Sequence, residues 1–345
     1  MGRDNDLQSK VFPRRHGELA SLVGFTKTES TYPTADADYF GADNRSSSVN
    51  LRRKCFSALL DLRSGMSTTH PYHGRRVALA TKHGKLAQIG PALRAAVSLE
   101  VVPVDLDTDM FGTFTGEIAR PGDTLHTAIA KAEAAAHAGM ISLGVASEGS
   151  FGPHPGSPFV SANLEIVVLV DLDIGCHIAE QVLTTNTNFA HVRLTPDQSP
   201  DDFAHSVGFP THALVVQPSV GPGKIIKGIT DDAELKSAIT ASAAASPDGQ
   251  ALVQTDMRAH CNPTRQLQIA EAANKLAKRL TVLCPACGAP GWGQVETKAG
   301  LPCEICGWPT NFILTIINGC AVCSFREAHD LDEVAKASYC PMCNP

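Results

Sequence analysis

The sequence is poor in several features that would mark particular classes of protein. Aromatic residues make up 6% and charged residues 19% of the 345 residues, and no apolar run approaches the about 20 residues of a membrane span. The first residues hold no apolar stretch of the kind that a secretory signal requires. Acidic residues outnumber basic ones by 35 to 29, which disfavours non-specific binding to nucleic acid or to an anionic membrane. We therefore expect a cytoplasmic, soluble protein with no membrane partner.

The N-terminal segment differs from the rest of the chain. Residues 1–65 contain 10 basic and 8 acidic residues and few periodic apolar positions, a composition typical of disordered segments. We interpret residues 1–70 as disordered, or as an extension that a mis-annotated start codon adds before a natural start at Met66. The N-terminal sequence of the native protein tests the second interpretation, which a mature chain beginning near Met1 would exclude.

From Val77 to residue 280, short apolar stretches alternate with helical patterns. Strands are expected at 77–80, 100–104, 141–146, 164–171, 176–184, 213–217 and 251–255, and helices at 86–97, 124–137, 200–207, 231–243 and 264–280. Pro91 is expected to break or kink the first helix. The alternation predicts a mixed-sheet α/β domain over 75–282. It is read either as one domain or as 75–195 followed by an α/β extension at 196–282.

Cysteines concentrate near the C-terminus. Eight of the 11 form four Cys-x-x-Cys pairs, which are Cys284/Cys287, Cys303/Cys306, Cys320/Cys323 and Cys340/Cys343. In a cytosolic chain this pattern indicates metal ligands rather than disulfides. Two pairs complete a closed Cys₄ zinc site, so residues 283–345 are predicted to hold two structural zinc ions in a double zinc-ribbon-like module.

The spacing allows two ways of joining the four cysteine pairs into two sites. The gaps between consecutive pairs are 15, 13 and 16 residues. We expect sequential pairing, first with second and third with fourth, because gaps of 15 and 16 suit ribbon hairpins. The alternative is an interleaved, cross-braced arrangement.

The charge of the predicted zinc module opposes a nucleic-acid role. Between Cys284 and Pro345 there are six acidic and three basic residues, which is unfavourable for binding phosphate backbones. We expect this module to contact a protein partner, with Trp292, Trp308 and Tyr339 as candidate contact residues. Packing of the same residues onto the α/β domain is an equal alternative.

Polar clusters follow two of the predicted strands. A turn with Thr81, Lys82 and Lys85 leads into a helix, where backbone amides and lysine side chains can bind phosphate. Ser147 and Glu148 follow a buried strand, at the sheet edge where α/β proteins bind ligands. A solvated basic turn and a solvated glutamate are the simpler alternatives.

A third cluster lies between the strand at 251–255 and the helix at 264–280. It contains Asp256, Arg258, His260 and Arg265 within ten residues. These side chains could position a phosphate or a purine. A salt-bridge network within the loop is an equally good interpretation.

Three motifs in this order resemble the inosine/xanthosine triphosphatase group of nucleotide pyrophosphatases. They are the strand followed by Thr81-x-x-x-Lys85, the helical Thr124-x-x-x-Ala128-x-x-Lys131, and Leu143-Gly144-Val145-Ala146-Ser147-Glu148-Gly149. The resemblance implies that Thr81, Lys85 and Lys131 bind phosphate and that Glu148 holds Mg²⁺. The sequence departs from the group in its single acid beside Gly149. Residues 195–280 and the zinc module have no counterpart there.

The stretch from Val77 to Pro345 also resembles a bacterial family of uncharacterised function. The shared motifs are Ala80–Lys85, Ala146–Pro155, Thr255–His260 and the final Cys340–Pro345. This second resemblance implies no activity.

Two hypotheses follow from these residues. The first is Mg²⁺-dependent hydrolysis of a nucleotide phosphoanhydride. Its catalytic residues would be Glu148, Lys131, Asp256 and His260, with Thr81, Lys82, Lys85, Arg258 and Arg265 binding phosphate. The second is a non-catalytic, zinc-stabilised binding or scaffold protein. The enzyme requires Lys85, Lys131 and Glu148 to meet within about 12 Å, the span of a typical small-molecule pocket.

Overall fold

The structure is a computed structural model that describes residues 69–82, 84–113, 115 and 117–345. The predictions for residues 1–68, including the start at Met66, and for His83 lie outside this range. The chain forms two compact units. The described part of the larger unit covers 69–293 and Gly319–Arg326, and the smaller unit contains Gln294–Asn318 and Glu327–Pro345. Within the described residues, no helix has the length and apolar character needed to cross a bilayer.

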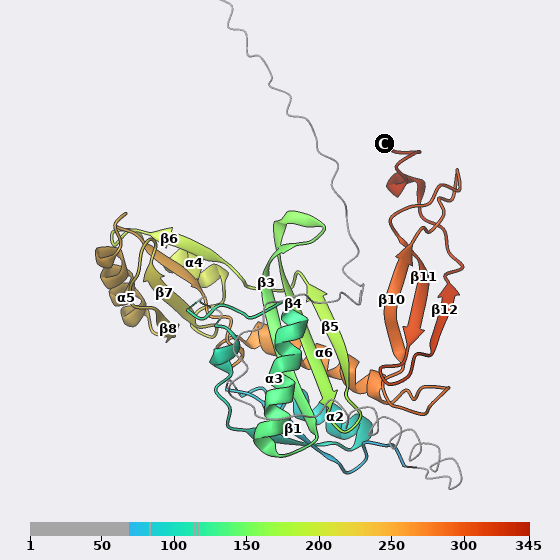
Figure 1. The fold of residues 1–345 in the computed structure, drawn as a ribbon. Helices are drawn as coiled ribbons and strands as arrows, with labels where there is room; N and C mark the ends of the chain where they lie inside the picture. Colours follow the sequence, from blue (N-terminus) through green and yellow to red (C-terminus); the bar gives the residue numbers. More distant parts are fainter. Residues whose placement is uncertain (1–68, 83, 114, 116) are drawn as a thin grey trace, which may run out of the picture. The chain divides into compact units, whose positions relative to one another are not determined.

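The larger unit is built on a five-stranded mixed sheet (Figure 1). Its strands are β1 (Arg76–Ala80), β2 (Glu100–Val104), β3 (Leu143–His154), β4 (Ser157–Asp171) and β5 (Cys176–Thr184). They lie in the order β2-β1-β3-β4-β5. The first three are parallel, and β3, β4 and β5 are antiparallel neighbours. The predicted mixed-sheet α/β fold is therefore confirmed.

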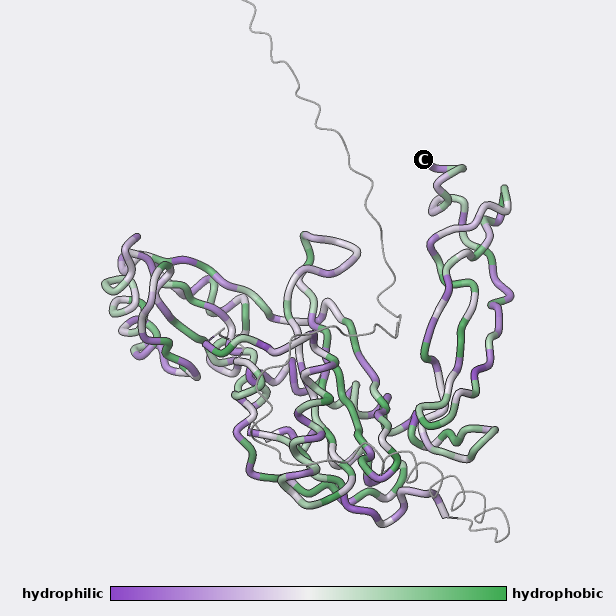
Figure 2. Tube along the Cα trace, viewed as in Figure 1, coloured by the Kyte–Doolittle hydropathy of each residue, from purple (hydrophilic) through white to green (hydrophobic). Residues whose placement is uncertain are grey.

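Helices cover both faces of this sheet, because its strands alternate two sets of apolar side chains. Val77 and Leu79 contribute to a core with α2 (Leu86–Val97) and α6 (Pro263–Leu280), whereas Ala78 and Ala80 pack with α3 (Thr124–Gly139). In Figure 2 the hydrophobic stretch of β4 runs through the middle of this sandwich. Gly144 permits the close approach of α3, because a Cβ there would lie 1.9 Å from the carbonyl oxygen of Ala132.

A second, four-stranded sheet is inserted between β5 and α6. Its strands are β6 (His191–Leu194), β7 (Leu214–Pro218), β8 (Ile226–Ile229) and β9 (Ala251–Thr255), in the order β6-β9-β7-β8 and all antiparallel. Helices α4 (Asp201–Ser206) and α5 (Asp232–Ala245) share its apolar core. Helix α6 then packs back on the first sheet, so the second sheet forms an insertion within the larger unit.

Two local expectations require correction. The strand expected at 141–146 was predicted to end before Ser147, but residues 147–154 continue it as β3, because β4 pairs with them as far as His154. Helix α2 also continues through Pro91. Pro91 is exposed, so the turn that lacks its amide hydrogen bond faces water.

Three further strands connect the cysteine pairs. They are β10 (Gly293–Ala299), β11 (Ile313–Gly319) and β12 (Arg326–Asp330), paired in that order. One strand lies between each cysteine pair and the next along the chain.

Candidate functional site

The larger unit contains a cavity of about 270 Å³ beside the point where β1 ends. Strand β3 pairs with β1 only at Gly144 and Val145 and then runs on past it. The polar residues that line the cavity come from both sheets, from α3, from α6 and from the segment after β2. They are Thr81, Lys82, Lys85, Thr108, Asp109, Thr113, Thr115, Arg120, Lys131, Ser147, Glu148, Lys227, Asp256, Arg258 and Arg265.

The structure brings together eight of the nine predicted non-cysteine site residues. Thr81, Lys82, Lys85, Lys131, Glu148, Asp256, Arg258 and Arg265 all line the cavity. The ninth, His260, is exposed and lies outside this lining. Burial and the charge of Arg258 lower the pKa of His260, but its position does not support the predicted role as a catalytic base.

Successive side chains of β3 point to opposite faces of the sheet, which explains why the Ser147 hydroxyl and the Glu148 carboxylate contact different helices. Ser147 lies on the same face as Val145, towards α2 and α6, whereas Glu148 lies on the face of Ala146, towards α3. Successive residues of one strand therefore reach Lys85, at the start of α2, and Lys131, on α3.

Glu148 is buried between two cations. Its Oε2 accepts a hydrogen bond from Lys131 Nζ at 2.6 Å, and its Oε1 accepts from Arg120 at 2.7 Å. The Arg120 guanidinium also donates to the carbonyl oxygen of Gly149 at 2.8 Å. Burial alone would raise the pKa of Glu148, but the charges of Lys131, Lys85 and Arg120 hold that pKa below its ordinary value. Glu148 is therefore ionised at neutral pH.

Lys85 is buried without a carboxylate partner in the described structure. Its Nζ donates to the backbone oxygen of Ser147 at 3.0 Å and lies 2.9 Å from the Ser147 hydroxyl oxygen. Burial, together with the charge of Arg265, lowers the pKa of Lys85 to about 8. The Thr81 hydroxyl accepts from the Lys85 backbone amide at 3.0 Å, so it shapes this turn. Lys82 instead forms exposed ion pairs with Asp107 and Asp109.

In the segment after β9, Asp256 forms an ion pair with Arg258. Asp256 is fully buried and accepts hydrogen bonds from the Arg258 side chain and from the backbone amides of Arg258 and Gly228. These bonds raise the pKa of Arg258. With both oxygens engaged, Asp256 positions Arg258 at the cavity wall and is poorly placed to accept a proton from water.

Arg265 reaches the cavity from the first turn of α6. Its guanidinium donates to both oxygens of Glu165, at 3.1 and 3.3 Å, and lies 5.2 Å from the centre of the Phe151 ring. Gly149 faces Glu165 across the β3–β4 pair. A Cβ on Gly149 would lie 2.6 Å from both Arg265 and Glu165, so the ion pair requires glycine there.

Three residues of this site escaped sequence reasoning. Arg120 and Lys227 line the cavity, and Lys227 forms an ion pair with Glu117. The third is Glu165, the buried partner of Arg265. Of the three, Glu165 carried the plainest signal, because a carboxylate in an otherwise apolar strand must be paired when buried.

The cavity lining carries an excess of positive charge. Seven Lys and Arg side chains face three Asp and Glu side chains among the described lining residues. Three carboxylates outside the lining, Asp107, Glu117 and Glu165, also pair with lining cations, so the excess rests on Lys85, which has no carboxylate partner in the described structure. Each of the three carboxylates, Asp109, Glu148 and Asp256, is paired with a Lys or Arg. Within the described residues, the groups with metal-ligand spacing are two sets of cysteines. As arranged here, the cavity fits an anion and not a resident Mg²⁺ ion.

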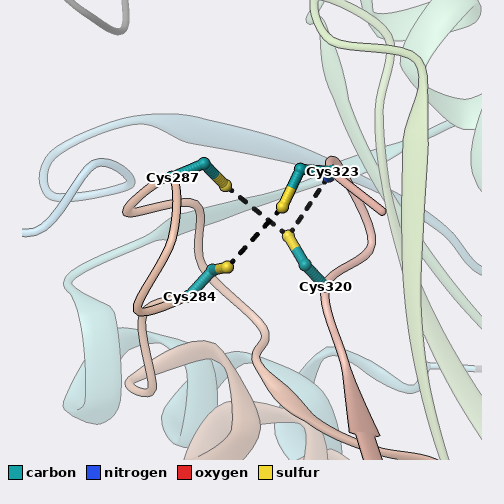
Figure 3. A group of neighbouring side chains, drawn as sticks. All are labelled: Cys284, Cys287, Cys320 and Cys323. Atoms are coloured by element: carbon teal, nitrogen blue, oxygen red, sulfur yellow. Dashed lines mark hydrogen bonds between the residues drawn. The ribbon is translucent and has the colours of Figure 1, made fainter. Parts of the chain in front are cut away.

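The eight predicted cysteine ligands form two groups of four. Cys284, Cys287, Cys320 and Cys323 form one group, shown in Figure 3, and Cys303, Cys306, Cys340 and Cys343 form the other. Sγ–Sγ distances between pairs are 3.7 and 3.8 Å in the first group and 3.6 and 3.9 Å in the second. A tetrahedron with Zn–S bonds of about 2.3 Å has edges of about 3.8 Å. Each group could therefore hold one zinc ion.

The expected sequential pairing is wrong. The first pair joins the third and the second joins the fourth, which is the interleaved alternative. The reason is the single strand between consecutive pairs: β10 leads from one group to the other, β11 leads back, and β12 leads out again. Gaps of 13 to 16 residues fit such strands as well as they fit closed ribbon hairpins.

The two groups differ in their surroundings. The first lies in the larger unit, where Ala289 and the half-buried Trp292 pack against it and Trp292 stacks on Phe325 at 5.3 Å. Of the three aromatic residues named as candidate contacts, Trp292 is therefore half-buried against this cysteine group. In the second group, Cys306 and Cys343 are exposed, and the nearby Trp308 and Tyr339 are 49% and 64% exposed.

Comparison with known proteins gives a family but no relative of known activity. The model of a domain of unknown function, DUF6671, matches residues 131–345, which is more than half of the chain. The matched range contains Lys131, Glu148 and all eight cysteine ligands. No curated protein matches the sequence.

Proposed function

Because the chain belongs to the DUF6671 family, a domain of unknown function, we propose a function from the cavity itself. The cavity binds the phosphates of a nucleotide, and the protein hydrolyses a phosphoanhydride bond of that nucleotide. The observation that carries this proposal is convergence. Eight residues chosen from separate motifs line one cavity, and Lys85, Lys131 and Glu148 meet within a few residues of β3.

The charge and size of the cavity support a phosphorylated ligand. Seven cationic side chains around about 270 Å³ match an anion with several oxygens, and arginine is well suited to phosphate geometry. The volume is close to the lower bound of about 300 Å³ for small-molecule pockets. It suits a phosphate chain and its adjoining sugar, with the nucleobase nearer the opening.

The residues present suggest how hydrolysis would be assisted. Negative charge develops on the phosphate oxygens as the anhydride bond breaks, and fixed cations lower the barrier by stabilising that charge. Lys131 and Arg120 are held in place by Glu148, and Arg265 is held by Glu165. Glu148 would bind Mg²⁺, as the resemblance implies, only if one of its two ion pairs opened, so no step is assigned to a metal.

Release of phosphate and pyrophosphate tests this function. Residues 66–345 are supplied with a panel of purine and pyrimidine triphosphates, with and without Mg²⁺. We expect release from at least one nucleotide and its loss in Glu148→Gln. Glu234→Gln, an exposed change at the start of α5, is the matched control. Silence across the panel from folded, zinc-loaded protein would overturn hydrolysis and leave the binding or scaffold function.

A second role concerns the smaller unit. Ile305, Trp308, Tyr339 and Met342 are all at least 49% exposed there, and all four lie in the chain next to the cysteine pairs of the second group. We propose that this surface contacts a protein partner. Cross-linking of the protein to its partners in cell extract tests this proposal, with the double variant Trp308→Ser and Tyr339→Ser as the comparison. The same cross-linked products from wild-type protein and the double variant would contradict it.

A further inference from the structure

Among the described residues of the cavity, Ser147 and Lys85 form a pair that joins a hydroxyl to a buried amine. Their Oγ and Nζ atoms lie 2.9 Å apart, within the range expected for a nucleophile and its base. Both side chains line the cavity, and the two residues are only 2% and 8% exposed. Neither position was predicted to act as nucleophile or base, and the hydrolysis proposed above does not require a covalent step.

We propose that Ser147 is a nucleophile and that Lys85 is the base that activates it. The proposal rests on the proposed function for its substrate, a nucleotide phosphoanhydride. The contact between the two side chains at the cavity wall does not depend on which substrate binds, so the pair can be tested without a nucleotide.

The environment of Lys85 favours this role over a fixed counter-ion. Every other Lys or Arg that lines the cavity has a carboxylate partner, whereas the described structure gives Lys85 none. A buried amine without a carboxylate partner loses its proton readily. With a pKa of about 8, a substantial fraction of Lys85 is neutral near pH 7.5 and able to accept a proton.

The step balances within the site. The Ser147 oxygen attacks a phosphorus atom of the bound anhydride while its proton moves to Lys85 Nζ. The bond from that phosphorus to the bridging oxygen breaks, and its electron pair leaves with the departing phosphate. Lys85, now an ammonium, lies beside the new phosphate ester. Water then attacks the phosphorus and the bond from phosphorus to the Ser147 oxygen breaks. The Ser147 oxygen takes back the proton from Lys85, which returns to the neutral amine, and the proton lost by the attacking water is released to solvent.

The positions of the nearby cations agree with this step. Arg265 lies on the same side of the sheet as Ser147, since α6 packs on the face of Val145 and Ser147. Lys131 and Arg120 approach the neighbouring residue Glu148 from the other side. A phosphate at Ser147 would therefore be flanked by cations that do not themselves need to lose a proton.

Labelling with a fluorophosphonate, which reacts with activated serine hydroxyls, tests the pair without any nucleotide. We expect wild-type protein to be labelled at Ser147, with a rate that rises through about pH 8, and Ser147→Ala and Lys85→Met to lose the label. A hydrogen bond with a merely structural role would give no label. Ser150→Ala, a nearby change on β3, is the control, and near-native melting temperature and zinc content show that each variant folds.

The nucleotide experiment separates this proposal from the proposed function. If a nucleotide is hydrolysed, rapid acid quenching of wild-type protein should trap a phosphorylated or nucleotidylated peptide containing Ser147. Hydrolysis that survives in Ser147→Ala would overturn the nucleophile and leave direct attack by water. Labelling of Ser147 without hydrolysis of any nucleotide would overturn the substrate but keep the pair. Absence of label from folded wild-type protein would overturn the pair.

Discussion

The cysteine groups and the cavity are held together in opposite ways. Each cysteine group is built from two Cys-x-x-Cys turns, and its four Sγ atoms lie within 4.8 Å of one another. Bonds from these sulfur atoms to one metal ion could therefore hold the group together. The cavity is assembled from residues as far apart as Thr81 and Arg265, and its side chains are positioned by two sheets and their helices. Replacing one cysteine should therefore destabilise its group through the loss of a metal ion, whereas replacing one cavity residue should leave a buried charge without its partner.

The largest effect is expected from breaking the first cysteine group. Cys320→Ser should lower zinc from two ions per chain to one and strongly lower the melting temperature. Structural zinc contributes on the order of 10 kcal/mol to small zinc-folded domains, and this group packs into the larger unit. Atomic emission and calorimetry measure both quantities.

Cys343→Ser, in the exposed group, should lose one zinc ion as well but leave phosphate binding intact. Loss of phosphate binding in this variant would show that the two regions depend on each other.

A smaller effect is expected from breaking an ion pair in the cavity. Lys131→Met should destabilise the larger unit by about 3–5 kcal/mol, because Glu148 remains buried beside a single cation. The Lys131 and Glu148 side chains are each 10% exposed, so solvent cannot replace the lost partner. Urea unfolding measures the change. A double change of Lys131→Met with Glu148→Gln should recover part of it, and no recovery would argue against a direct pair.

The buried Lys85, which has no carboxylate partner in the described structure, predicts a dependence of stability on pH. Since its folded pKa of about 8 lies below the ordinary 10.5, the unfolded chain binds more protons between these values. The free energy of unfolding should therefore rise with pH across this window, by about 3 kcal/mol for this group. Binding of an anion should weaken over the same window, because Lys85 loses its charge.

Unfolding and phosphate titrations at pH 7, 8.5 and 10 measure this dependence. The comparison is with Lys85→Met, in which both trends should be reduced. Equal pH profiles in the two proteins would remove Lys85 as their source.

The smallest effect is expected from Lys82. Its ammonium forms exposed ion pairs with Asp107 and Asp109, and such surface pairs contribute little to stability. Lys82→Ala should leave the melting temperature unchanged and reduce phosphate affinity only slightly. A loss of affinity as large as that in Lys131→Met would show that Lys82 turns into the cavity when ligand binds.

Sequence reasoning predicted some parts of this molecule well, for physical reasons. Regular amphipathic patterns with caps located α3, whose N-cap Asp123 accepts from the His126 amide, and apolar runs located β1 and β9. The identity of the eight cysteine ligands was readable because the chemistry lies within each Cys-x-x-Cys pair. Their pairing was not, because it depends on how many strands separate the pairs in space.

The cavity shows the same division. The motifs around Lys85, Lys131 and Glu148 were visible because each follows or covers a strand. Arg120 and Lys227 were not, because a loop and the short strand β8 carry no periodic signal. The two faces of β3 could not be assigned either. The strand was expected to end at residue 146, so the alternation that places Ser147 and Glu148 on opposite sides was not predicted.

Calorimetric titration of pyrophosphate tests the central claim, that the cations of the cavity bind phosphate. Arg120→Gln is the most useful variant, because Arg120 is 32% exposed in its side chain and Glu148 keeps its bond to Lys131. Wild-type protein and Lys236→Met, an exposed control on α5, should bind pyrophosphate alike, and Arg120→Gln should bind it about tenfold more weakly. Absence of binding by folded wild-type protein, or equal binding by all three, would contradict it.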